Sequence, residues 1–333
     1  MNRRQFIIGS TAVVAGCGRK APPGPVGAPR PTDAMDARYS RQFHLEKLKG
    51  HEADRNATFT TPPPSADVLA VAPELKALIK VTVRLHPRYS VEPGPKESKL
   101  GGMFWWPADE PWPRGDSNNP LAAVLQLRAE DAPPNWPFRP DTDLFQLFWH
   151  PQTDRHDYRP TQAVVRWRKS TEPIQQLVSP PAESTDALMD FVPVPCRLFP
   201  ERVMEFPNVE ALPTVMKDKL APKPGIELYQ RELSVAEGTK VGGYPRWKGK
   251  AEPPACDRCK WGMDYLLTVA AEEWTDLTSD RWKPVQNRDE KSSETASRAA
   301  GLQFLSRKGN TSDNGNVHVY MCRRCEDWPV RLV

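Results

Sequence analysis

Four of the six cysteines in this chain form two Cys-x-x-Cys pairs, Cys256 with Cys259 and Cys322 with Cys325. Two intervening residues allow a tight turn to direct both sulfurs at one ion, and two such turns supply the four thiolates of a tetrahedral zinc site. The charge of such a centre would be offset by four neighbouring basic residues: Arg258, Lys260, Arg323 and Arg324. We therefore expect one structural zinc ion held by the four paired cysteines.

Two other chemistries remain open for these pairs. The 62 residues between Cys259 and Cys322 exceed the usual zinc-ribbon spacing, and an exported protein could instead link the pairs by disulfides. Basic neighbours would also lower the thiol pKa, as redox catalysis requires. However, a thioredoxin-like pair opens a helix in a βαβ unit, and the proline-rich surroundings here favour strands and loops.

The N-terminus is typical of an export signal. Arg3 and Arg4 form a positive region, and residues 6–16 form a short apolar stretch that is too short to span a bilayer as a helix. Residues 2–7 resemble the twin-arginine export motif, so we expect a signal peptide over residues 1–16.

Cys17 directly follows Val14-Ala15-Gly16, which resembles a bacterial lipoprotein cleavage site. There a diacylglycerol is attached to the cysteine sulfur before the signal is removed. We expect a lipid on Cys17 and a protein held at the cell membrane or outer membrane of a bacterial envelope. A signal peptide without lipid, or an apolar N-terminal strand with an incidental cysteine, are the alternatives.

The segment after Cys17 has the composition of a tether. Residues 21–31 contain five prolines and two glycines, a composition that favours extended backbone and has no apolar face to bury. We expect a disordered tether and polar segment over residues 17–62. No other segment is apolar enough to cross a membrane, so the predicted attachment is by lipid alone.

Composition limits the remaining possibilities. The chain has 333 residues, 37 of them proline, which favours strands, turns and short helices. Its formal net charge is +4, and 44 basic and 42 acidic residues remain without Arg3 and Arg4. Such a balance gives no support for a nucleic-acid-binding surface.

Local patterns predict several elements. Prolines and apolar periodicity indicate helices over residues 73–80 and 212–220. Alternation predicts strands over residues 81–85, 163–168, 191–194 and 202–206. Residues 284–300 are polar and are expected to form a surface loop.

Three sequence blocks occur twice in the same order. Residues 99–106 match residues 240–247, each with a Gly-Gly pair; residues 124–131 match 266–273; and residues 143–149 echo 316–321. Ordered matches indicate a duplicated unit. We expect a β-rich α+β domain over residues 63–333, built of two duplicated mixed-sheet units with short helices, over residues 81–190 and 225–333.

At these blocks the chain resembles the YwqG-like bacterial proteins, a family of unknown function. The resemblance is carried by Ser98 to Gly102, Trp112-Pro113, Ala123 to Leu127, Pro140 to Trp149 and Lys240 to Trp247. Asp143, where the family usually has glycine, departs from its pattern. The C-terminal half is also similar to the C-terminal domain of the programmed-cell-death-2 and ribosomal-protein chaperone group, which implies binding of a protein client. Neither resemblance implies a catalytic residue.

Other residues are weaker candidates for a site. Trp105, Trp106, Trp112 and Trp247 could line a ligand groove, although packing in the core and loops is the simpler explanation of these tryptophans. Cys196 lies in an apolar alternating segment and is expected in the core. The loop from His150 to Asp157 could hold a metal or simply form a solvated turn.

The sequence lacks the signatures of common enzymes, including the Gly-x-Ser-x-Gly elbow, His-Glu-x-x-His and the phosphate loop. We therefore expect a lipid-anchored, zinc-stabilised binding or assembly module with a protein or peptide ligand. The alternative is an enzyme, either a thiol–disulfide oxidoreductase or a hydrolase with its site between the repeats.

Overall fold

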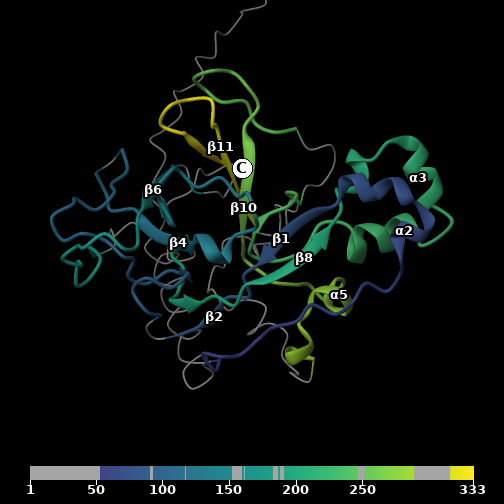
Figure 1. The fold of residues 1–333 in the computed structure, drawn as a ribbon, viewed down its shortest axis with the longest axis horizontal. Coiled ribbons are helices and arrows are strands. Elements are labelled where there is room, and N and C mark those ends of the chain that lie inside the picture. Colours follow the sequence, from purple (N-terminus) through teal and green to yellow (C-terminus); the bar gives the residue numbers. More distant parts are fainter. Residues whose placement is uncertain are drawn as a thin grey trace, which may run out of the picture.

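The structure is a computed structural model, shown in Figure 1. It describes residues 53–333 apart from residues 91–92, 117, 152–159, 161, 183–186, 188–190, 247–251 and 289–315. The predicted signal peptide, the lipidation site and most of the predicted tether lie outside the described residues.

Two six-stranded sheets form the framework. In spatial order, the first, sheet A, contains β12 (Val330–Leu332), β11 (Asn316–Met321), β10 (Asp264–Ala270), β9 (Lys240–Gly242), β1 (Lys80–Arg84) and β8 (Glu201–Glu205). Sheet B contains β2 (Arg88–Tyr89), β7 (Cys196–Arg197), β3 (Lys99–Leu100), β4 (Ala122–Arg128), β5 (Leu144–Trp149) and β6 (Ala163–Arg168). The predicted β-rich α+β class is confirmed, and the strand pairs are antiparallel rather than mixed.

The helices are short, as the proline content predicts. The α-helices are α2 (Val68–Val71), α3 (Thr214–Leu220), α4 (Ile226–Leu228) and α5 (Ser279–Trp282), and α4 continues into the π-helical turn η5 (Tyr229–Leu233). The 3-10 helices are η1 (Pro73–Leu78), η2 (Ala129–Asp131), η4 (Val209–Ala211) and η6 (Val285–Asn287). In Figure 1, α2 and α3 lie together at one end of the molecule, beyond β1 and β8. Among the described residues, no helix has the length and apolar character needed to cross a membrane.

The strand order shows the duplication directly. Sheet B runs β2-β7-β3-β4-β5-β6 and sheet A runs β8-β1-β9-β10-β11-β12, so β1 to β6 correspond to β7 to β12. Each repeat contributes one strand to the other's sheet, because β1 pairs with β9 and β7 pairs with β3. The register irregularity also recurs, between Ala123 and Leu125 in β4 and between Tyr265 and Leu267 in β10.

Both sheets contribute to one core. Leu125 and Phe145 of sheet B and Leu267 and Val317 of sheet A belong to the same buried apolar cluster. Trp136, from the loop between β4 and β5, donates its indole N–H to the carbonyl of Leu266, at 3.1 Å. The two repeats therefore stabilise each other through apolar burial.

Most predicted elements are confirmed, with one clear error. The strand over residues 163–168 is β6, and those over 81–85 and 202–206 are β1 and β8, shifted by one residue. The helix over 212–220 is α3, and that over 73–80 is the 3-10 helix η1. The strand expected over residues 191–194 is wrong: β7 begins at Cys196, and Pro193 and Pro195 remove two backbone donors just before it.

Candidate metal centre and adjoining pocket

The two Cys-x-x-Cys pairs meet at one end of sheet A. Cys256 and Cys259 lie in the loop that leads into β10, and Cys322 directly follows β11. Because β10 and β11 pair antiparallel with Asp264 opposite Met321, the start of one strand and the end of the other are adjacent. Pairs far apart in sequence are thereby placed on neighbouring turns.

Each pair forms its own tight turn. In the first, the Lys260 N–H donates to the Cys256 carbonyl at 2.9 Å, and the Cys256 N–H donates to the Trp261 carbonyl at 2.8 Å. In the second, the Cys322 N–H donates to the Pro329 carbonyl at 2.9 Å. These bonds close the two loops and hold the sulfurs close to one another.

The four sulfurs have the spacing of a tetrahedral zinc site. They all lie within 4.8 Å of one another, with 3.9 Å between Cys256 and Cys325, 3.5 Å between Cys259 and Cys322, and 3.8 Å between Cys322 and Cys325. Tetrahedral coordination with Zn–S bonds of about 2.3 Å requires sulfurs about 3.8 Å apart. A disulfide requires about 2.05 Å, and all four cysteines are free thiols in this structure. The residues present thus fit zinc.

The thiols of the cluster differ in acidity. Backbone N–H groups of Cys259 and Arg258 lower the pKa of the Cys256 thiol to about 7. Burial and the neighbouring sulfurs raise the pKa of the Cys325 thiol to about 12. A divalent cation is the natural counter-charge for four thiolates held this close together.

The basic residues near the cysteines brace the two turns against each other. Three ion pairs cross between the segments: Arg258 with Asp327 at 2.6 Å, Arg331 with Asp257 at 3.2 Å and Arg323 with Asp264 at 2.7 Å. The Arg324 guanidinium lies 3.8 Å from the centre of the Trp261 ring. Exposed pairs of this kind contribute little each, so a metal held by the four sulfurs would be the main link between the turns.

The described part of repeat one carries no comparable cluster. His150 follows β5 where Cys322 follows β11, and its side chain is buried. In the part of the chain that the structure describes, the four cysteines are the one group of cysteine, histidine and acidic side chains close enough to hold a metal. Among the described residues, the candidate metal centre therefore belongs to repeat two.

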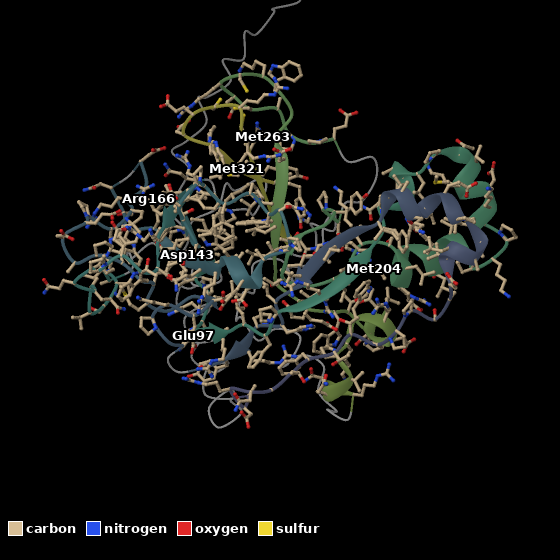
Figure 2. All side chains as sticks on the ribbon, in the orientation of Figure 1. Glu97, Asp143, Arg166, Met204, Met263 and Met321 are labelled. Atoms are coloured by element: carbon tan, nitrogen blue, oxygen red, sulfur yellow. The ribbon has the colours of Figure 1, made fainter. Side chains whose placement is uncertain are left out.

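A pocket of about 450 Å³ adjoins the metal centre. Met263 lines it and packs in one cluster with Cys256, Cys322 and Tyr320. Figure 2 shows Met263 near Met321, the last residue of β11, which Cys322 follows. The other lining side chains include Lys80, Asn208, Tyr244, Tyr265, Tyr320 and Arg323.

A buried ion pair supports the wall of this pocket. Lys240 and Glu205 are fully buried, and the Lys240 ammonium lies 2.7 Å and 3.0 Å from the two Glu205 carboxylate oxygens. Lys240 also donates to the Tyr244 carbonyl at 2.7 Å, and Glu205 accepts the Ala236 N–H at 2.7 Å and the Tyr244 N–H. Burial lowers the pKa of Lys240 and raises that of Glu205, while each charge opposes the shift of the other.

Gly243 allows the backbone to pass close to the Glu205 carboxylate. Its φ is +75°, and a Cβ at this position would strike the Glu205 carboxylate. The second glycine of the Gly-Gly pair is therefore required by the chain's close packing against a buried charge.

A hydrogen-bonded chain fixes the Tyr265 ring. The Arg246 carbonyl lies 3.0 Å from His318 Nε2 and can only accept, so Nε2 carries the proton and Nδ1 accepts. The Thr268 hydroxyl, 2.8 Å from Nδ1, must then donate to it and accept from the Tyr265 hydroxyl at 2.6 Å. Burial raises the Tyr265 pKa well above its usual value, which keeps this hydroxyl neutral.

Other predicted residues fall in several settings. Trp106 and Trp112 are buried in a cluster with Phe104 and Phe148, and Trp105 is half-buried beneath Lys96 at 4.4 Å. Two of the four suggested groove residues are thus buried, although Trp112 also lines a pocket of about 180 Å³. Cys196 is buried, as expected, and burial raises the pKa of its thiol. The remaining candidates, which are Cys17, Arg3, Arg4, Trp247 and residues 152–157 of the loop that begins at His150, lie outside the described residues.

Sequence reasoning missed the Lys240–Glu205 pair and the pocket. A signal was present, because Lys99 and Lys240 open the duplicated Gly-Gly blocks. Both lysines are buried, and each donates to the carbonyl four residues later, Met103 at 3.0 Å and Tyr244 at 2.7 Å. A lysine repeated at a strand position was itself evidence for a buried charge.

Comparison with known proteins gave one family. A family model described as a domain of unknown function, DUF1963, matches residues 98–282, more than half of the chain. A search of curated proteins found no match. The expected membership in a family of unknown function is thus confirmed, and the similarities to YwqG-like proteins and to the chaperone group remain predictions.

Proposed function

We propose, for a chain that belongs to the DUF1963 family of unknown function, that it is a lipid-anchored envelope protein with a binding role. In this proposal the four cysteines hold a structural zinc ion, and the pocket beside them receives a protein or peptide ligand. The observation that carries the proposal is that a pocket of about 450 Å³ shares Met263 and Tyr320 with the apolar cluster that contains Cys256 and Cys322.

The sulfur geometry supports zinc over redox catalysis. A redox pair acts as an isolated pair of sulfurs that exchanges a disulfide with its substrate. Here the Cys322 sulfur lies closer to Cys259 of the other pair, at 3.5 Å, than to Cys325 of its own pair, at 3.8 Å. The four sulfurs face one another instead of a substrate.

The polar groups around the pocket are bonded to one another, which supports a binding role over a catalytic one. Lys240 and Glu205 neutralise each other, and the Tyr265 hydroxyl is bonded to Thr268. A general acid or base needs a pKa near the working pH and a free path to substrate. These groups instead act as a rigid frame, which suits a preorganised binding site.

Thiol reactivity separates the proposed binding role from the oxidoreductase alternative. We expect the four cysteines of the purified full chain to resist alkylation by iodoacetamide until a chelator is added. After chelation all four should react, because zinc no longer shields the thiolates. Mass spectrometry of the alkylated peptides gives the count, and Cys196, buried in the core, is the internal control that stays unmodified in both conditions. Fast alkylation of one pair without chelator, together with disulfide reductase activity, would establish the oxidoreductase instead.

The proposed anchor has its own test. In a bacterial host, Cys17→Ser should release the protein from the membrane fraction, because no thiol remains to accept the lipid. Immunoblotting of membrane and soluble fractions measures the change. A Cys17→Ser chain that stays membrane-bound to the same extent would rule out lipid attachment at this residue.

A further inference from the structure

The two repeats place a pocket at the same position of each sheet. The pocket beside the metal centre measures about 450 Å³, and a second one in repeat one measures about 180 Å³. Each is lined by the second glycine of a Gly-Gly turn, Gly243 in the larger pocket and Gly102 in the smaller. Because the two repeats correspond, the lining residues of the two pockets can be compared position by position.

Two positions on the fourth strand of each repeat show the first difference. Ala122 and Ala123 line the smaller pocket, and they directly precede the register irregularity of β4. The matching residues before the irregularity of β10 are Asp264 and Tyr265, which line the larger pocket. Two alanines are thus replaced by a carboxylate and a phenol.

Two further positions change from proline to a cation. Pro151 stands two residues after β5 and lines the smaller pocket, whereas Arg323 stands two residues after β11 and lines the larger one. By register, Pro193 before β7 matches Lys80 at the start of β1. The change again places a basic side chain at the larger pocket.

These exchanges leave one cation outside any direct ion pair. Arg323 pairs with Asp264 at 2.7 Å. Among the described residues Lys80 makes no such pair, although the Glu205 and Asp264 carboxylates are near enough to attract it. Its ammonium lies 4.1 Å from the Tyr244 ring centre and 3.4 Å from the Gly243 carbonyl. The charged lining consists of two cations and one acid, so the pocket favours an anion.

The rest of the lining favours an apolar group. Tyr320 and Met263 are buried at the side that faces the metal centre, and Tyr265 is held by its bond to Thr268. Rigid aromatic surface gives contact area at little entropic cost. The volume also lies within the range of pockets that enclose small organic ligands.

We propose that this pocket binds an organic carboxylate joined to an apolar or aromatic group, with the carboxylate on Lys80 and the apolar group against Tyr265 and Met263. The inference rests on the proposed binding function and names its ligand class. A free organic acid and the C-terminus of a peptide both offer this chemistry. Phosphate esters fit less well, because planar carboxylate needs only the single cation that the pocket leaves unpaired.

Paired probes test the charge requirement on the unaltered protein. Phenylacetate and phenylacetamide have the same shape and differ in charge. In the zinc-loaded full chain with ¹³C-labelled methionine methyl groups, phenylacetate should shift the Met263 resonance and leave Met103, beside the smaller pocket, unchanged. We expect phenylacetamide to bind at least about tenfold more weakly, because a charge-assisted hydrogen bond is lost.

Matched lysine variants test the assigned contact. Lys80→Met keeps the side-chain length and should weaken phenylacetate binding at least about tenfold, to the level of the amide. Lys76→Met removes another exposed lysine from the same segment and should leave binding unchanged. Acetyl-Pro-Phe with a free C-terminus, compared with its amide, extends the test to peptides. Tighter binding of the free peptide than of phenylacetate identifies a peptide ligand, and the reverse order identifies a free acid.

Several results would overturn the inference. These are equal binding of acid and amide, unchanged binding in Lys80→Met, or no shift of Met263 with any of the acids. Equal binding of acid and amide at Met263 would leave the binding function intact and reject only the carboxylate. Reactive, metal-free cysteines would reject the zinc-braced binding function itself, whichever probe binds.

Discussion

Cys322→Ser is expected to abolish zinc binding and to lower the free energy of unfolding by more than about 4 kcal/mol, since loss of a structural metal is among the most destabilising single changes. The reason is local: Cys322 directly follows β11, and its sulfur lies 3.5 Å from Cys259 and 3.8 Å from Cys325. Without the metal, three buried or half-buried thiols lose their shared ligand. Chemical denaturation with urea, followed by tryptophan fluorescence, measures the loss.

The unaltered chain provides the control for this prediction. A chelator should lower its unfolding midpoint toward that of Cys322→Ser, while the variant itself should not respond to chelator. If chelator leaves the midpoint of the unaltered chain unchanged, the cluster does not stabilise the fold through a metal. If Cys322→Ser unfolds at the same urea concentration as the unaltered chain, the four-sulfur cluster has no structural role.

Lys240→Met is expected to cost about 3–5 kcal/mol, because it leaves the Glu205 carboxylate buried without its counter-charge. The ammonium bonds both Glu205 oxygens and the Tyr244 carbonyl, so three contacts are lost together. Equilibrium unfolding measures the change. Lys219→Met, which breaks the exposed pair with Glu74, should change stability by no more than about 0.5 kcal/mol.

A second substitution isolates the charge effect. Glu205→Gln added to Lys240→Met removes the uncompensated charge, keeps an oxygen for the Ala236 N–H and supplies an amide N–H for the Tyr244 carbonyl. The double variant should therefore be more stable than Lys240→Met alone. A double variant that is less stable than either single variant would mean that charge burial is not the main cost.

The repeat was predictable from sequence because its blocks coincide with paired strands. The Gly-Gly blocks contain β3 and β9, the second blocks lie on β4 and β10, and the third on β5 and β11. The two cysteine pairs were likewise predictable, because a Cys-x-x-Cys turn is formed by four consecutive residues and can be recognised in the sequence. Their approach across 62 intervening residues followed from the antiparallel pairing of β10 with β11.

The remaining features depend on long-range packing. The exchange of β1 and β7 between the sheets leaves no local pattern, because each strand is short and paired with distant residues. In the sequence, Glu205 is one acidic residue at the end of a predicted strand. Only the folded structure brings Lys240 against it. The pocket likewise draws its lining from both repeats, since Asn135 and Pro137 come from repeat one.

Native mass spectrometry of the purified full chain, with and without Cys322→Ser, tests the zinc centre most directly. We expect one zinc ion per chain, lost in the variant, because the four sulfurs of Cys256, Cys259, Cys322 and Cys325 lie at tetrahedral spacing. A metal-free chain lighter by two or four protons would instead show disulfides and contradict the account.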